Sequence, residues 1–242
     1  MRAGNLLALR KAWRSLADRA GWLAREVAAA TERIAGRERE IVQRLSRAAE
    51  HRDWETGAHI LRIGMYSRIM ADQLGLPADE VDAISWASPM HDVGKIGIPD
   101  YVLLKPGRLD DAEFAVMKKH TTYGWQILGG SDVPLLQLAA EIALSHHERF
   151  DGTGYPNGWS GEKIPYPGRI VAVADVFDAL TSTRPYKRPW DADAAFAHLR
   201  ESAGAHFDPA CVDACVNRRD DILAAQQQYR DEFPDGTESK PA

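Results

Sequence analysis

An apolar helical stretch runs into a histidine and an aspartate in Ile84-Ser-Trp-Ala-Ser-Pro-Met-His-Asp-Val-Gly-Lys-Ile-Gly-Ile-Pro99. From residue 57 onward, apolar residues recur at helical spacing, glycine and proline residues separate the segments, and no period-two strand extends beyond a few residues. We therefore expect an all-α core. Two long polar loops interrupt it, at residues 97–109 and 149–167, because both stretches are rich in turn-forming residues.

The predicted helices share apolar faces, and several begin at proline or aspartate, which favour helix starts. They cover residues 57–74, 77–92, 111–128, 134–148, 168–181, 191–203 and 209–227. Residues 221–242 hold the end of the last helix and a segment rich in Pro, Asp, Gly, Ser and Lys, which is typical of a flexible tail.

The first 50 residues carry a different pattern, in which a seam of side chains recurs every 3.5 residues. The seam consists of Leu6, Leu9, Trp13, Leu16, Ala20, Leu23, Val27, Ala30, Ile34, Arg37, Ile41, Arg44 and Ala48. Leucine at alternate seam positions in the first three heptads favours a parallel two-stranded coiled coil, so we expect a homodimer; Arg37 and Arg44 interrupt the seam. The alternative is an amphipathic helix packed on its own globular domain.

Composition excludes several classes of protein. The chain has 242 residues, 45% of them hydrophobic and 27% charged, as in soluble globular domains. No apolar stretch reaches the length of about 18 residues that a membrane span requires, so we expect a cytoplasmic protein without a membrane partner. Residues 1–50 carry 11 Lys/Arg against 6 Asp/Glu, a local charge of +5 that leaves −10 for the rest of the chain. The net negative charge of residues 51–242 argues against binding to nucleic acid.

Histidines and aspartates gather at the helix ends and are the candidate metal ligands. They are His59, His91, Asp92, His120, His146, His147 and Asp175. Asp175 lies in the apolar helix Ile170-Val-Ala-Val-Ala-Asp-Val-Phe177, so we expect it to be buried and to need a partner such as a metal ion. Any one histidine alone could be an ordinary hydrogen-bonded imidazole, but the adjacent pairs favour ligands. Imidazoles and carboxylates without thiols fit catalytic Mn, Fe, Ni, Co or Zn; Cys211 and Cys215 are predicted to be packing residues.

The order of the motifs carries a resemblance to a known family. The motifs are Glu55-Thr-Gly-Ala-His59, His91-Asp-Val-Gly-Lys95, His120, His146-His-Glu148, Asp151-Gly-Thr-Gly-Tyr-Pro156, Ala174-Asp-Val-Phe-Asp178 and Arg184-Pro-Tyr-Lys187. In this order and spacing the chain resembles the HD-GYP family, a branch of the HD phosphohydrolases that degrades cyclic di-GMP. The resemblance implies an HD-domain helical bundle with additional C-terminal helices. Together with the seam of the first 50 residues and the composition of the C-terminal segment, it predicts a stalk over residues 1–50, a catalytic domain over 51–220 and a helix end with a tail over 221–242.

The resemblance also implies two metal sites that share one ligand. His59, His91, Asp92 and Asp175 would hold one ion, and Asp92, His120, His146 and His147 would hold the other. Glu55 would face a third ion, as in a trinuclear subgroup of the family. The implied cofactors are two or three divalent transition-metal ions, iron or manganese.

Further residues match the family's catalytic and substrate-binding positions. Lys95, Arg184 and Lys187 match bases that contact phosphate, and Lys95 would act beside Asp92 in catalysis. Asp178 matches an acid near the attacking water, with a supporting acid behind a ligand as the alternative. The loop with Gly154 and Tyr155 would cover the substrate, where Tyr155 stacks on guanine or stabilises the turn.

The implied activity is metal-dependent hydrolysis of cyclic di-GMP to pGpG and on to GMP, as the output of a bacterial two-component system. One alternative is a phosphohydrolase of another nucleotide, such as cyclic GMP-AMP. Another is a module of little activity that senses a cyclic dinucleotide or docks a signalling protein through the loop with Gly154, Tyr155 and Pro156, the GYP loop. The start of the stalk, Gly4-Asn-Leu-Leu-Ala-Leu-Arg10, resembles the exit from a receiver domain, so we expect an upstream receiver or sensor domain.

Overall fold

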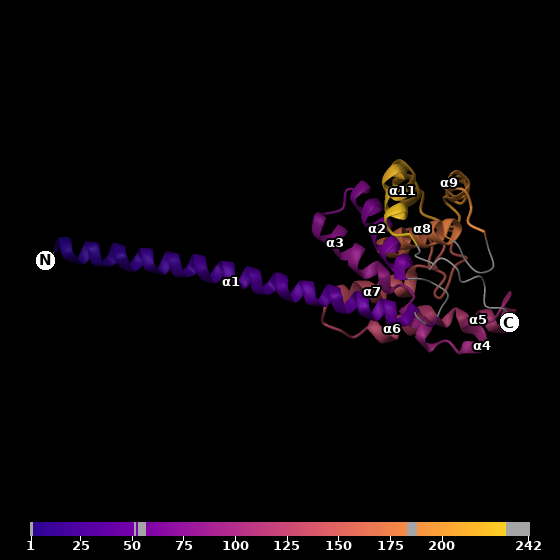
Figure 1. The fold of residues 1–242 in the computed structure, drawn as a ribbon, viewed down its shortest axis with the longest axis horizontal. Helices are drawn as coiled ribbons and strands as arrows, with labels where there is room; N and C mark the ends of the chain where they lie inside the picture. The colour runs from indigo at the N-terminus through magenta and orange to yellow at the C-terminus, as the bar shows by residue number, and fades with distance from the viewer. Residues whose placement is uncertain (1, 51, 53–56, 183–187, 231–242) are drawn as a thin grey trace. The chain divides into compact units, whose positions relative to one another are not determined.

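The computed structural model describes residues 2–50, 52, 57–182 and 188–230, and most of them are helical (Figure 1). The α-helices are α1 (Arg2–Glu50), α2 (Gly57–Gln73), α3 (Ala78–Ala87), α4 (Asp100–Leu103), α5 (Asp111–Met117), α6 (Lys119–Leu128), α7 (Pro134–Ser145), α8 (Tyr166–Thr181), α9 (Ala192–Glu201), α10 (Pro209–Asn217) and α11 (Arg219–Gln228). The 3-10 helices are η1 (Ser88–Met90), η2 (Val93–Gly97) and η3 (Gly161–Lys163). The described residues form no strand, only an isolated bridge between Ala203 and Phe207. The predicted all-α fold is confirmed.

The chain divides into two compact units, residues 1–41 and 42–242. The first is the N-terminal part of α1. Of its seam, the large side chains that the structure describes are each more than half exposed: Trp13, Leu16, Leu23, Val27, Ile34 and Ile41. Among the described residues, none of the helices combines the length and the apolar character that crossing a bilayer requires.

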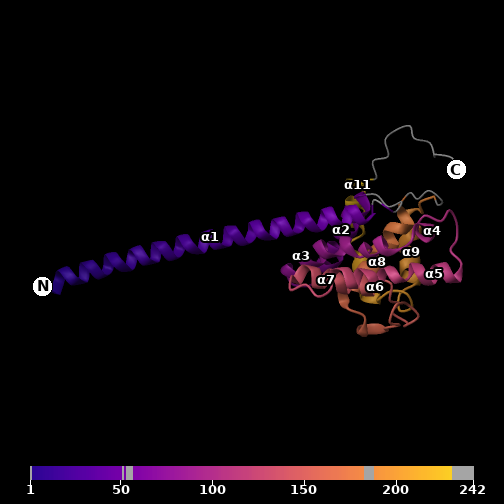
Figure 2. The ribbon, with the colours of Figure 1, turned by 90° about the horizontal axis from the view of Figure 1, so that it is seen from below.

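Helices α2 and α8 form the centre of the second unit, where they lie against each other (Figure 2). Tyr66 of α2 packs edge to face on Phe177 of α8, with ring centroids 5.6 Å apart, and both side chains are fully buried. Burial of each such large side chain contributes about 1.5–3 kcal/mol. Helices α3, α10 and α11 pack on α2, and α7 and α9 pack on α8. This packing fixes the polar side chains of α2 and α8 that face each other.

The predicted helix over residues 111–128 is interrupted at Lys118 and forms α5 and α6 instead. After the break, two side chains hydrogen-bond to carbonyl oxygens three residues earlier in the chain. The Nδ1 of His120 lies 2.8 Å from the carbonyl oxygen of Met117, and the hydroxyl of Thr121 donates to the carbonyl of Lys118 over 2.9 Å. Such side-chain bonds compete with the backbone bonds of a continuous helix.

Other element boundaries also differ from the prediction. The helix predicted over residues 77–92 ends at Ala87 and continues as η1, because Pro89 supplies no backbone N–H. The helix predicted over 209–227 is broken at Arg218, and the loop predicted over 97–109 contains the single turn α4. Cys211 and Cys215 are free and buried in α10, as expected of packing residues, and burial raises the pKa of Cys215 to about 12.

Candidate metal centre

The close approach of η2 to α6 brings the first ligands together. A side chain at Gly94 would clash with the carbonyl oxygen of His120 and the backbone nitrogen of Gly124, so only glycine allows this contact. Asp92, just before η2, therefore lies beside His120 at the start of α6. Its Oδ1 is 3.2 Å from the Nε2 of His120.

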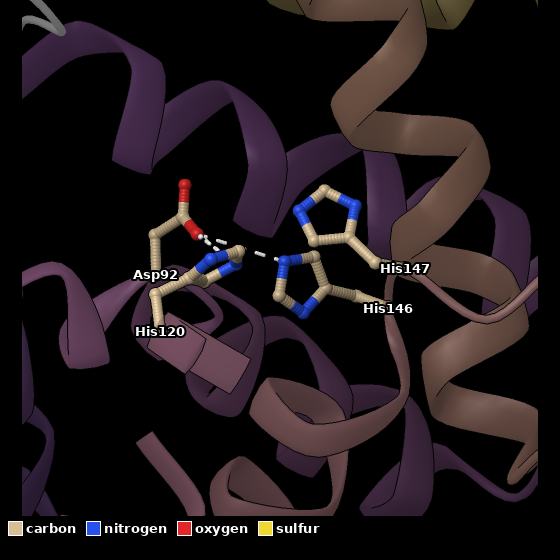
Figure 3. A group of neighbouring side chains, drawn as sticks. All are labelled: Asp92, His120, His146 and His147. Atoms are coloured by element: carbon tan, nitrogen blue, oxygen red, sulfur yellow. Dashed lines mark ion pairs between the residues drawn. The ribbon is translucent and has the colours of Figure 1, made fainter. Parts of the chain in front are cut away.

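Four side chains form the first candidate site, as Figure 3 shows: Asp92, His120, His146 and His147. One ligand atom from each lies within 4.8 Å of the others. The two adjacent histidines follow the last turn of α7, which ends at Ser145 and not at residue 148 as predicted. Asp92, His120 and His146 are buried, and His147 is half-buried. The first site thus gathers three imidazoles around one carboxylate.

A second candidate site lies next to the first and consists of His59 of α2, His91 after η1 and Asp175 of α8. Their ligand atoms also lie within 4.8 Å of one another. Asp92 stands between the two sites. Its Oδ2 is 3.4 Å from the Nε2 of His91, and its Oδ1 is 3.6 Å from the Nε2 of His146. Each oxygen of one carboxylate therefore faces a different site, which is the arrangement expected of a bridging ligand.

Backbone and side-chain acceptors orient the imidazoles. The Nδ1 atoms of His91, His120 and His146 lie within hydrogen-bond distance of the carbonyl oxygens of Ser88 (3.0 Å), Met117 (2.8 Å) and Ile142 (3.1 Å). A carbonyl can only accept, so each Nδ1 carries a hydrogen, which leaves Nε2 to act as the ligand atom. These bonds hold the rings in the orientation that metal binding needs.

Burial and charge give these ligands their protonation states. Burial alone would raise the pKa of the Asp92 carboxyl, but Lys95 and His91 lower it well below its usual value. Burial lowers the pKa of His120 to about 4, and burial together with His146 lowers the pKa of His147. Burial alone would lower the pKa of His91, whereas the adjacent Asp92 raises it to about 9. Cation binding would thus displace a proton from His91.

The buried atoms of the site fit a cation. Within the described part of the chain, no hydrogen-bond partner satisfies the Nε2 atoms of His91, His120 and His146 or the Oδ1 of Asp92, although all four atoms are buried. Unsatisfied buried polar atoms cost free energy, and four converging ones are rare outside functional sites. Neutral imidazoles around an ionised carboxylate are ligands for divalent transition metals. The residues present therefore fit divalent metal ions.

Asp178, not Asp175, is the deeply buried acid of α8. The side chain of Asp178 is 1% exposed, whereas that of Asp175 is 17% exposed and lies 3.9 Å from the Nε2 of His91. The expectation that Asp175 is buried was therefore wrong. Asp175 lies one helical turn before Asp178 and is partly exposed, at the second candidate site instead of in the core.

Asp178 lies behind His59. Its Oδ2 is 2.7 Å from the Nδ1 of His59, and both of its oxygens accept hydrogen bonds from Arg62, at 2.5 and 2.9 Å. Ser182 donates a further bond over 3.1 Å. Burial alone would raise the pKa of Asp178, but His59 and Arg62 lower it. This position favours the supporting role over the water-orienting role, the two alternatives that the sequence left open.

The remaining predicted residues of the described part of the chain surround the two sites. The ammonium of Lys95 lies 2.8 Å from the Oδ2 of Asp92, and the side chain is 14% exposed. The ring of Tyr155 lies over His147, with centroids 4.9 Å apart and planes tilted by 33°. A side chain at Gly154 would clash with the backbone from His147 to Arg149, so this glycine packs the loop onto the end of α7. Glu55, Arg184 and Lys187 lie outside the described residues.

Two residues to which the sequence analysis assigned no role support the site. Glu148 is 2% exposed, and its carboxylate accepts the backbone N–H groups of Asn157 (2.7 Å) and Trp159 (3.1 Å), which holds the loop in place. Arg62 is the partner of Asp178. The signal for Arg62 was its spacing, because it lies three residues after His59 on the same helix face. The signal for Glu148 was its position directly after the histidine pair.

Comparison with known proteins identifies the class of protein. The family described as "HD domain" matches residues 11–211, so the chain belongs to the HD-domain family. A relative from Xanthomonas campestris pv. campestris, "Cyclic di-GMP phosphodiesterase response regulator RpfG", is 50% identical over 218 residues, which are 90% of this chain and 58% of the relative. The predicted resemblance to the HD-GYP branch is confirmed.

Two further matches bear on substrate and fold. A Vibrio cholerae relative, "3'3'-cGAMP-specific phosphodiesterase 2", is 46% identical over 193 residues, 80% of this chain and 37% of the relative. A solved structure of the V. cholerae cyclic GMP-AMP phosphodiesterase V-cGAP3 aligns with a TM-score of 0.55 and 19% identity, over 79% of this chain and 49% of the other. The chain thus spans only about half of the length of the relatives that it matches.

Proposed function

We propose that the chain is a metal-dependent phosphodiesterase that hydrolyses cyclic di-GMP to linear pGpG and further to GMP. One observation carries the proposal: the carboxylate of Asp92 lies between two groups of ligand atoms, 3.2 Å from the Nε2 of His120 on one side and 3.4 Å from that of His91 on the other. Relatives named for cyclic di-GMP hydrolysis support the substrate.

The chain's own residues prepare the site for this reaction. His59, His91 and Asp175 would hold one ion and His120, His146 and His147 the other, with Asp92 shared between them. Iron or manganese in these positions would supply Lewis acidity, which activates water and polarises a phosphate oxygen. The Nδ1 contacts keep the imidazoles in place without reorganisation. Lys95, beside Asp92, would contact the scissile phosphate and balance its charge.

Three proposed roles fall on residues outside the described part of the chain. Glu55 would contribute to a third ion, since it lies four residues before His59 in the sequence. Arg184 and Lys187 would bind the second phosphate of the cyclic dinucleotide, because arginine and lysine form strong charge-assisted bonds with phosphate. Their positions in the sequence, three and six residues after the last residue of α8, support this role.

The proposed setting is a cytoplasmic signalling protein of a two-component system. A relative named as a response regulator supports an upstream receiver or sensor domain. The exposed seam of α1 supports a parallel homodimer through a coiled coil. The GYP loop would be the place for a docking partner.

The decisive experiment follows hydrolysis of cyclic di-GMP by chromatography, with anaerobically purified protein that has been supplied with iron or manganese. We expect pGpG to appear first, and GMP after it. Cyclic GMP-AMP is the second candidate substrate, because a relative of 46% identity is named for it, and it should be hydrolysed more slowly. Faster turnover of cyclic GMP-AMP would reverse this assignment, and no turnover of either dinucleotide would reject the phosphodiesterase.

The seam of α1 predicts the oligomeric state. Leu16 and Leu23 are 59% and 53% exposed, and their replacement by aspartate would place charges in the middle of a coiled-coil interface. Light scattering should find a dimer for the unmodified chain at micromolar concentration and a monomer for the variant with both substitutions. Asp18→Lys, which changes charge outside the seam, is the control and should remain dimeric. A monomeric unmodified chain would contradict the coiled coil.

A further inference from the structure

Phe114 of α5 is a large aromatic side chain that does not serve the core. It is 43% exposed, and no residue of α5 is buried. Val116 and Met117 on another face of the same helix pack on the small apolar cluster around Ile98, so α5 is already attached without Phe114. An exposed aromatic ring on a face that packing leaves open is a candidate binding surface.

A chain of ring contacts connects Phe114 to the candidate metal centre. Its ring meets Tyr155 edge to face, with centroids 6.1 Å apart and planes at 82°. Tyr155 in turn lies 4.9 Å from the ring of His147 and 6.4 Å from that of His120. Phe114 is therefore one aromatic ring away from two predicted ligands. A substrate group next to the metals could reach it.

Lys118 adds a hydrogen-bond donor at the same place. It lies four residues after Phe114, and its ammonium is 4.8 Å from the centroid of the Phe114 ring and 5.5 Å from that of Tyr155. The ammonium therefore lies over both rings, where the negative charge of the aromatic faces attracts it. The combination offers a partly exposed aromatic ring with an ammonium donor over one of its faces.

The start of α5, the helix that carries Phe114, is held firmly, so the backbone below this surface is already ordered. Asp110 and Glu113 form a reciprocal capping box, in which the Asp110 side chain accepts from the N–H of Glu113 over 2.9 Å and the Glu113 side chain accepts from the N–H of Asp110 over 2.8 Å. Lys105 binds the same Glu113 carboxylate. A backbone that is already ordered loses little entropy when the surface binds a ligand.

We propose that Phe114, Lys118 and Tyr155 form a guanine-binding site, in which a base of the substrate replaces the ammonium of Lys118 on the face of Phe114 and accepts hydrogen bonds from the displaced ammonium. Guanine presents O6 and N7 as adjacent acceptors, which suit a lysine, whereas adenine presents an amino donor in place of O6. Aromatic rings stack on any base, so Phe114 provides affinity and Lys118 provides the choice of base. This inference rests on the proposed function, because it takes the substrate to be a guanine dinucleotide.

The first test measures Phe114→Ala and Phe114→Trp in the metal-loaded, full-length chain. Loss of stacking should raise the KM for cyclic di-GMP by about tenfold or more, with kcat and metal content little changed, while tryptophan should restore the KM. Trp125→Ala is the matched control, since Trp125 is an aromatic residue of α6 that is 45% exposed and should leave the KM unchanged. Equilibrium binding of the slowly hydrolysed bisphosphorothioate analogue of cyclic di-GMP should weaken in parallel.

The second test measures the choice of base with Lys118→Met. This variant should lower the preference for cyclic di-GMP over cyclic di-AMP by about tenfold, because it loses the donor to O6 and N7. An unchanged KM and an unchanged affinity for the analogue in Phe114→Ala would overturn the guanine site and assign the exposed ring to a docking surface for another protein. Equal loss toward both dinucleotides in Lys118→Met would also overturn it, and would make Lys118 a phosphate ligand.

The outcomes for the unmodified chain separate this inference from the proposed function. If the unmodified chain binds the analogue but hydrolyses neither dinucleotide, the phosphodiesterase is rejected. The affinities of the Phe114 variants for the analogue still test the guanine site in that case. If the unmodified chain hydrolyses cyclic di-GMP and Phe114→Ala changes neither the KM nor the affinity for the analogue, the phosphodiesterase is retained and the guanine site is rejected. Absence of both binding and hydrolysis would reject both proposals.

Discussion

Replacement of both His91 and Asp92 by alanine should remove the bound metal and lower phosphodiesterase activity by more than about a thousandfold. The reason is geometric: Asp92 faces both candidate sites, 3.4 Å from the Nε2 of His91 and 3.2 Å from that of His120, so its loss removes the one carboxylate of the first site and the carboxylate that faces His91 of the second. Elemental analysis of anaerobically prepared protein measures the metal, and turnover of cyclic di-GMP measures the activity.

A matched control replaces His198, a histidine of α9 that belongs to neither candidate site, and should keep both metal and activity. Glu55→Ala should reduce the metal content by about one ion per chain if a trinuclear site forms as the family resemblance implies. The unmodified chain should bind at least two ions. Less than one ion after metal supplementation, or an unchanged content in the double variant, would contradict the metal assignment.

Replacement of Asp178 by alanine should have the largest effect on stability. Arg62 is 3% exposed, and both oxygens of Asp178 accept bonds from its guanidinium, so the variant leaves a buried charge without its carboxylate. Breaking a buried pair in this way costs about 3–5 kcal/mol of unfolding free energy. Activity should also fall about 10–100-fold, because the Nδ1 of His59 loses the oxygen that orients it.

Denaturant unfolding of metal-free protein measures the stability without a contribution from bound ions. Asp178→Asn keeps the shape and a hydrogen bond and should recover part of the loss. Asp72→Ala removes an exposed partner of Arg218 and should change the stability little, since exposed ion pairs contribute little. Equal stability of Asp178→Ala and Asp72→Ala would show that the buried pair is unimportant.

The sequence predicted the helical class and the ligand types because both depend on local patterns. Apolar spacing and proline or aspartate starts mark the helices, and adjacent His-Asp and His-His pairs mark the ends where ligands gather. The interruption at Lys118 was not predictable in the same way. It depends on side-chain bonds to carbonyls, such as that of Thr121 to Lys118, which compete with a helix that the apolar spacing alone would continue.

The site's support could not be predicted, since it joins residues far apart in the chain. Arg62 and Asp178 are separated by 116 positions, and only the packing of α2 on α8 makes them partners. The same packing decides which acid of α8 is buried. A pattern that is apolar on nearly all sides predicts burial for both Asp175 and Asp178, and the structure assigns full burial only to Asp178.

The carboxylate of Glu148 connects the end of α7 to the loop that follows it. Glu148 comes directly after the two histidines, and its carboxylate accepts hydrogen bonds from the backbone of Asn157 and Trp159. Gly154 and Tyr155 of the same loop pack against His147. A displacement of this loop would therefore shift His147, whose ring lies against Tyr155, and its neighbour His146. A protein that binds the loop from outside could in this way change the geometry of the candidate metal ligands without touching them.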